Sequence, residues 1–140
     1  MEGEKRKALE WVLKRNPNPL EEDEVKDILQ RHLESQDWEV KVRRGQTKGI
    51  DVEATRSTEH WVIEAKGWAS GKEQQQGNYF LAALGEVLQR MERDDVKYSL
   101  AFPDIPRYRA LWDRIPRLAK HRTGVSCLFV DKAGQVVEVP

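Results

Sequence analysis

The chain has 140 residues, of which 34% are charged and 39% hydrophobic, and its 24 basic residues balance its 24 acidic ones. This length fits one domain with a single core, and the five Trp among periodic apolar residues exclude a disordered chain. The single Cys127 excludes an internal disulfide and a cysteine-based zinc cluster. Because no apolar run reaches the roughly 18 residues that span a bilayer and the N-terminus lacks the apolar segment of a secretory signal, we expect no membrane contact and a cytoplasmic location.

The first half of the chain is predicted to hold two helices and three strands, over residues 3–15, 20–36, 38–43, 50–55 and 61–66. Val25, Ile28 and Leu29 indicate the second helix, since they recur at helical spacing behind a first turn rich in acids. From Trp38 onward apolar and polar residues alternate, which is typical of half-buried strands. The short turns between the three strands predict an antiparallel meander.

The second half is predicted to hold two helical segments and three strands, over residues 72–93, 96–102, 106–121, 125–130 and 135–139. Pro116 is expected to break or kink the second helical segment. The full order of elements predicts an α/β domain with a mixed sheet flanked by helices. We expect one domain over residues 1–140, with residues 1–19 as a helical extension at its N-terminus.

Three charged residues are predicted to converge on neighbouring strands. Asp51 is placed on the second strand, and Glu64 and Lys66 lie two apart on the third, so the latter two share a face. The hairpin sets Asp51 beside Glu64, and two such carboxylates repel unless a cation neutralises them. Oxygen ligands from both carboxylates and from the Ala65 carbonyl suit Mg²⁺. With Lys66 to hold the attacking water or to stabilise the developing charge, this pattern predicts metal-assisted phosphodiester hydrolysis.

A second interpretation is a surface ion network, because cross-strand ion pairs are ordinary in antiparallel sheets. The neighbourhood of the pair favours the site instead. Apolar residues precede Glu64, and the small Ala65 separates it from Lys66. We interpret this as a charged pair at the end of a central strand.

The zero net charge hides two basic segments. Residues 41–48 hold four bases and no acid, and residues 107–122 hold six bases and one acid. Local positive charge attracts phosphate even in a neutral protein, and two solvated surfaces are the equally supported alternative. The residues expected to contact nucleic acid are Lys41, Arg43, Arg44, Lys48, Lys72, Arg107 and Arg109.

The segments Gly49-Ile50-Asp51 and Ile63-Glu64-Ala65-Lys66, on an α-β-β-β-α-β order, resemble the PD-(D/E)XK nuclease superfamily and its restriction endonuclease-like fold. Gln75 and Tyr79 add a Gln-x-x-x-Tyr element, similar to that of nuclease domains found with recombination helicases. The resemblance covers roughly residues 20–102, and Ile50 stands where the nominal motif has Pro. The catalytic set that it implies is Asp51, Glu64, Lys66, Gln75 and Tyr79.

The resemblance also implies a metal site. Asp51 and Glu64 would bind Mg²⁺ or Mn²⁺, and the first helix of the family often adds an acid. Glu24 is the first candidate for that acid, with Glu21 and Asp27 open by helical register. Surface acids that complement the helix dipole are the other interpretation of these three residues.

We therefore expect a metal-dependent DNA endonuclease. The sequence contains no motif of a separate DNA-recognition module, so cutting is expected to be structure-selective or non-specific. A chain this small needs a second copy or a partner to cut both strands, and a homodimer is one expected arrangement. The alternative is a module that keeps the fold without catalysis and binds nucleic acid or protein. The choice between DNA and RNA stays open at this point.

Overall fold

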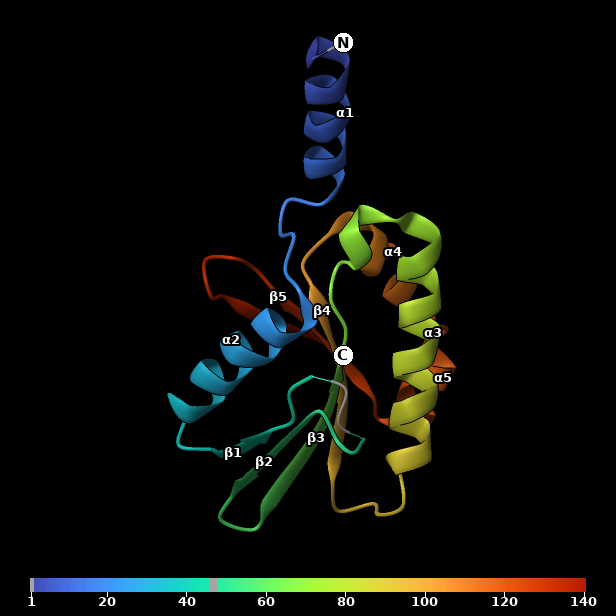
Figure 1. Cartoon of the computed structure of the whole chain (residues 1–140). Coiled ribbons are helices and arrows are strands. Elements are labelled where there is room, and N and C mark those ends of the chain that lie inside the picture. Colours follow the sequence, from blue (N-terminus) through green and yellow to red (C-terminus); the bar gives the residue numbers. More distant parts are fainter. Residues whose placement is uncertain (1, 46–47) are drawn as a thin grey trace.

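The structure is a computed structural model that describes residues 2–45 and 48–140. The elements follow the predicted order (Figure 1). They are α1 (Glu2–Arg15), α2 (Glu22–Glu34), β1 (Glu39–Val42), β2 (Val52–Arg56), β3 (Glu59–Ala65), the 3₁₀ turn η1 (Ala69–Gly71), α3 (Glu73–Arg90), β4 (Lys97–Pro103), α4 (Pro106–Asp113), α5 (Arg117–Thr123), β5 (Ser126–Val130) and β6 (Val136–Val139). The segment predicted as helical over 106–121 is two helices, because Pro116 cannot continue a helix and instead caps α5.

Six strands of the described residues form one mixed sheet in the order β1-β2-β3-β4-β5-β6. β1, β2 and β3 pair antiparallel, as the predicted meander requires. α3 crosses over between β3 and β4, so these neighbours run parallel; β5 also pairs parallel, and β6 returns antiparallel. β3 and β4 are therefore central strands, and both are buried along most of their length.

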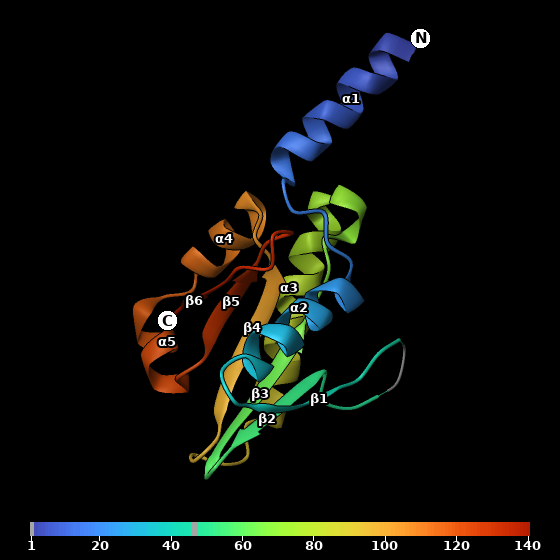
Figure 2. The same ribbon diagram turned by 90° about the vertical axis from the view of Figure 1, so that its left-hand side faces the viewer.

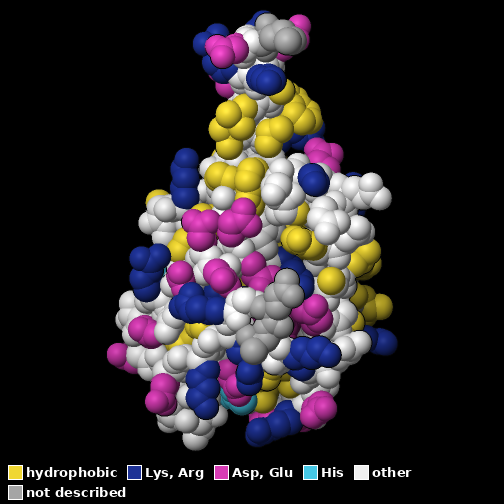
Figure 3. All heavy atoms as spheres, in the orientation of Figure 1, with side chains coloured by type: hydrophobic (Ala, Val, Ile, Leu, Met, Phe, Trp, Pro, Cys, Tyr) yellow, Lys and Arg dark blue, Asp and Glu magenta, His cyan; other side chains and the backbone are white. Residues whose placement is uncertain are grey.

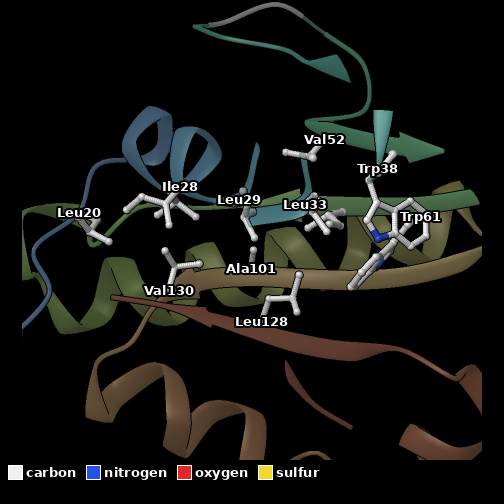
Figure 4. Packing of buried hydrophobic residues seen from close by; sticks show 14 residues of the cluster. Leu20, Ile28, Leu29, Leu33, Trp38, Val52, Trp61, Ala101, Leu128 and Val130 are labelled. Carbon is white, nitrogen blue, oxygen red and sulfur yellow. The ribbon is translucent and has the colours of Figure 1, made fainter. Parts of the chain in front are cut away.

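Helices cover both faces of the sheet (Figure 2). The sheet therefore separates the apolar core into two halves, one on each face. In the first half, Leu29 and Leu33 of α2 pack on Trp38, Trp61 and Ala101 (Figure 4). Burial of one such leucine contributes about 1.5–3 kcal/mol to stability. The apolar spacing that predicted α2 is thus the stripe that faces the sheet.

The second half of the core joins α3 and α4 to the other face. The Phe102 ring of β4 stacks with Phe80 of α3 and with Tyr108 of α4, at centroid distances of 5.4 and 4.3 Å. The Tyr108 hydroxyl donates a hydrogen bond of 2.7 Å to the Gly67 carbonyl. α4 thereby fixes the chain just beyond the end of β3.

α1 extends away from the sheet, and none of its described side chains is buried (Figures 1 and 2). Leu9 and Trp11 are each 57% exposed. The end of α1 is anchored, because the buried Asn16 accepts a hydrogen bond of 2.8 Å from the Gln76 amide of α3. Among the described helices, α1 included, none is both long and apolar enough to cross a bilayer.

Gly67 lies where the chain leaves β3 against the first turn of α2. A Cβ at this position would come within 2.6 Å of the Glu22 backbone nitrogen, which cannot swing away as a side chain can. We expect Gly67→Ala to lower the free energy of unfolding by about 1–3 kcal/mol, as overpacking does. Urea denaturation measures this loss.

The matched control is Gly85→Ala within α3, where a Cβ meets nothing within 4 Å. Alanine is the better helix former, so this variant should be more stable by up to about 1 kcal/mol. Equal losses in the two variants would contradict the close packing of α2 on Gly67.

Candidate active site

Asp51 lies directly before β2, so the prediction that it sits on the strand is wrong. Its Oδ2 accepts a hydrogen bond of 2.9 Å from the Ala65 N–H of β3. This side-chain oxygen takes the place of a backbone carbonyl. The regular pairing of β2 with β3 therefore begins at Val52, opposite Ile63, and not at Asp51. The same register sets Asp51 beside Glu64.

Glu64 is buried near the end of β3, with 1% of its surface exposed. The Arg90 Nε of α3 donates to its Oε1 at 3.2 Å. Burial raises the pKa of the Glu64 carboxyl to about 8, and the neighbouring Asp51 adds to this rise against the opposing effect of Arg90. Without a bound cation, Glu64 therefore holds a proton up to a higher pH than an exposed glutamate does.

A third carboxylate comes from α3. One oxygen each from Asp51, Glu64 and Glu86 lies within 4.8 Å of the others, and we call these three residues the acidic cluster. Lys66 follows β3 directly, and its Nζ lies 3.3 Å from the Glu86 Oε1. The structure thus brings together the three charged residues predicted from the strand pattern.

Sequence reasoning missed Lys26, Glu86 and Arg90. A signal for two of them was available, because Glu86 and Arg90 follow Tyr79 by seven and eleven residues and so share its face of α3. Lys26 gave no such signal, since a lysine among helix acids is ordinarily a surface residue. In the structure it is buried, and its Nζ lies 3.5 Å from the Asp51 Oδ1.

The predicted supporting residues Gln75 and Tyr79 line a cavity of about 420 Å³ beside the end of β3, together with Lys72. The Lys66 Nζ lies 6.0 Å from the centre of the Tyr79 ring. Lys66 therefore lies between this cavity and the acidic cluster. The catalytic roles of Gln75 and Tyr79 stay predictions.

The three acids considered at the start of the 20–36 helix lie outside the acidic cluster, although Glu21 lines the cavity of Gln75 and Tyr79. Glu24 accepts a hydrogen bond of 3.0 Å from the Glu21 N–H, which closes the start of α2. The Glu21 carboxylate accepts a hydrogen bond from the Trp68 indole, and Asp27 pairs with Arg44. The metal roles of Glu24 and of the Ala65 carbonyl stay predictions, and Glu86 is the acid found beside Asp51 and Glu64.

The residues expected to contact nucleic acid differ in how free their charges are. Those exposed at the surface without a described ion pair are Lys41, Arg43, Lys48 and Lys72. Arg44 pairs with Asp27, and Arg109 donates two hydrogen bonds to Asp104. Arg107 is half-buried, and residues 46 and 47 of the first basic segment lie outside the described residues. On the face between α2 and α3, acidic and basic side chains are interspersed (Figure 3).

The acidic cluster has the composition of a site for a hard divalent cation. Its ligand atoms are all carboxylate oxygens, which Mg²⁺ and Mn²⁺ prefer. Three bases, Lys26, Lys66 and Arg90, each contact one of its carboxylates. The cluster can therefore hold a metal ion, and its charge is balanced by protein groups when it holds none.

Two solved structures resemble this chain. One is a FdxN element excision controlling factor protein from Anabaena variabilis, at 17% identity and a TM-score of 0.56, with 81% of this chain and 95% of that chain covered. The other is an XisH family protein from Nostoc punctiforme, at 17% identity and a TM-score of 0.49 over the same shares. No model of a protein family matches the sequence, and no curated protein does. The first likeness and the order of elements confirm the predicted fold, a restriction endonuclease-like α-β-β-β-α-β core with a mixed sheet between helices.

The raised pKa of Glu64 predicts a pH dependence of stability. Between the ordinary pKa of 4.5 and about 8, the folded protein holds a proton that the unfolded chain releases. Stability therefore falls as pH rises through this range, by at most about 1.4 kcal/mol per pH unit from this group. Glu64→Gln removes the titration, so its stability should fall less steeply.

Urea denaturation at pH 5 to 9 in the presence of a chelator measures both slopes. The two proteins should differ most above pH 8, where wild type must hold a buried carboxylate. Parallel curves for wild type and variant would mean that Glu64 titrates normally.

Proposed function

We propose that this protein is a metal-dependent nuclease that hydrolyses phosphodiester bonds in DNA. The observation that carries the proposal is the acidic cluster with the Lys66 ammonium beside it, at the end of a central strand of a restriction endonuclease-like core. Carboxylates that bind a cation and a lysine that faces them are the groups that phosphodiester hydrolysis requires.

The acidic cluster would hold Mg²⁺ or Mn²⁺ through one oxygen from each carboxylate. A cation bound there polarises the phosphate and lowers the pKa of water. The raised pKa of Glu64 means that a bound cation must compete with a proton for its carboxyl group. Metal affinity should therefore rise with pH.

Lys66 is placed to assist the attack of water. Its side chain is 18% exposed, so it reaches both the cluster and the solvent. The ammonium would orient the water and stabilise negative charge that develops on the phosphate oxygens. The water oxygen bonds to phosphorus and releases one proton to bulk water. The bond to the leaving sugar oxygen breaks, and this oxygen takes up a proton from bulk water to give a hydroxyl and a phosphate monoester.

The substrate strand would pass along the cavity lined by Gln75 and Tyr79. Lys72 precedes α3 at this cavity, where the helix start also favours phosphate. The exposed bases Lys41, Arg43 and Lys48 would extend the contact to neighbouring phosphates. Such contacts give affinity without reading bases, so we expect structure-selective or non-specific cutting that weakens with salt. A homodimer would supply a second site for the other strand.

A second candidate, a binding module without catalysis, is favoured by one observation. The carboxylates of the acidic cluster already pair with Lys26, Lys66 and Arg90. These three contacts form without a metal. The two candidates differ in whether metal and Lys66 are needed for hydrolysis.

Cleavage of labelled duplex, single-stranded and four-way-junction DNA, and of RNA, with Mg²⁺ or Mn²⁺, separates the candidates. Wild type should cut only with metal. Lys66→Ala should lower the rate at least about a hundredfold, because it removes a charge aimed at the transition state. DNA binding should largely survive this change.

Lys97→Ala is the matched control. Lys97 also pairs with a glutamate, Glu138 at 2.7 Å, but it lies opposite Trp61 toward the other end of β3. Its loss should leave the rate within about twofold, as exposed ion pairs contribute little. Wild type that binds DNA yet stays inert with every metal would favour the binding module, and equal loss in both variants would contradict the role of Lys66.

A further inference from the structure

Lys26 is a buried cation behind the acidic cluster. It lies in the middle of α2, and only 1% of its surface is exposed. Its Nζ donates a hydrogen bond of 2.6 Å to the Arg43 carbonyl. It also lies 3.0 Å from Glu22, 3.9 Å from Asp23 and 3.5 Å from Asp51.

The burial of Lys26 is not explained by its helix neighbours. Glu22 and Asp23 lie one turn earlier in α2, and their side chains are 36% and 52% exposed, so they could pair with a lysine at the surface. Removing an ammonium from water costs several kcal/mol unless anions and hydrogen bonds offset it. Burial alone would lower the pKa of Lys26, but Glu22, Asp51 and Asp23 outweigh it and raise the pKa. Of the three carboxylates near Lys26, Asp51 is the one that lies outside α2 and belongs to the acidic cluster.

Asp51 receives a hydrogen bond from one element and an ion pair from another. The Ala65 N–H of β3 reaches its Oδ2 at 2.9 Å, and the Lys26 ammonium of α2 lies 3.5 Å from its Oδ1. Asp51 stands before β2, and its carbonyl accepts a hydrogen bond of 2.9 Å from the Arg43 N–H, but this backbone bond does not set the direction of its carboxylate. The hydrogen bond at Oδ2 and the ion pair at Oδ1 both restrain the carboxylate next to Glu64 and Glu86.

We propose that Lys26 is a positioning residue that holds Asp51 in the orientation needed to bind the metal. This inference rests on the proposed function, because it assigns Asp51 to that metal site. Two effects of removing Lys26 oppose each other. Loss of a positive charge makes the site more negative and favours a cation, whereas loss of the donor frees Asp51 to turn away. We expect the freedom of Asp51 to turn away to have the larger effect.

Calorimetric titration with Mn²⁺ alone, without substrate, tests which of the two effects on metal binding is larger. Lys26→Met keeps the bulk of the side chain and removes the charge. We expect its Mn²⁺ dissociation constant to rise by about tenfold or more, as for groups that orient a metal ligand. In an Asp51→Asn background, Lys26→Met should weaken binding no further, because the group that it positions is gone.

Glu22→Gln is the matched control, since it removes another partner of Lys26 but leaves the contact with Asp51. Its Mn²⁺ affinity should stay within about twofold of wild type. If circular dichroism shows that Lys26→Met is unfolded, Lys26→Gln replaces it. Glutamine keeps a donor but on a shorter side chain, so the Mn²⁺ dissociation constant is again expected to rise.

Unchanged or tighter Mn²⁺ binding by a folded Lys26 variant overturns the proposal and leaves the nuclease assignment standing. Weaker binding in Lys26→Met and Glu22→Gln alike also overturns it, because the effect would then follow from a general disturbance of α2 and not from the contact with Asp51. Wild type that binds no Mn²⁺ and cuts no DNA overturns the proposed function itself. The metal titration of wild type therefore distinguishes the two failures.

Discussion

A carboxyl group inside an apolar core is the constraint on which the rest of the site depends. Glu64 belongs to β3, a central strand covered by helices on both faces. Ile63 and Ala65 face α2, so the alternation of the strand turns Glu64 toward α3. A carboxylate in that place costs several kcal/mol unless it is protonated or paired. The raised pKa and the contact with Arg90 are the two ways in which the structure meets this cost.

The fold meets the same constraint from both sides of the sheet. α3 brings Arg90, which offsets the charge of Glu64, together with Glu86, which adds to the repulsion, and α2 brings Lys26 to Asp51 from the other side. α2 can approach the end of β3 because the chain continues there as Gly67, which allows the first turn of α2 to come within backbone contact. The hydroxyl of Tyr108 fixes the same point from α4. The site is thus the place where three layers of the domain converge.

Most of the fold could be predicted from the sequence, because apolar spacing reports which face of each element is buried. The pairing of Asp51 with Glu64 could be predicted as well, since hairpin register follows from the alternation. Residues brought in by long-range packing could not. Whether Glu86 or Glu24 joins the cluster depends on how α3 crosses the sheet, which no local pattern encodes. The same holds for two adjacent glutamines, since Gln76 is buried against Asn16 while Gln75 stays exposed.

The crossover that delivers α3 also determines when the site can form during folding. Asp51 and Glu64 belong to a meander with short connections, whereas Glu86 arrives only when α3 has crossed and β4 has paired parallel with β3. Closing this longer loop costs more chain entropy, and parallel pairing is slow to form. The meander is therefore expected to assemble first, with Glu64 still in water and ionised as in a free peptide. A chain in which only the meander has formed would lack the acidic cluster, so the step that completes the core also brings its three carboxylates together.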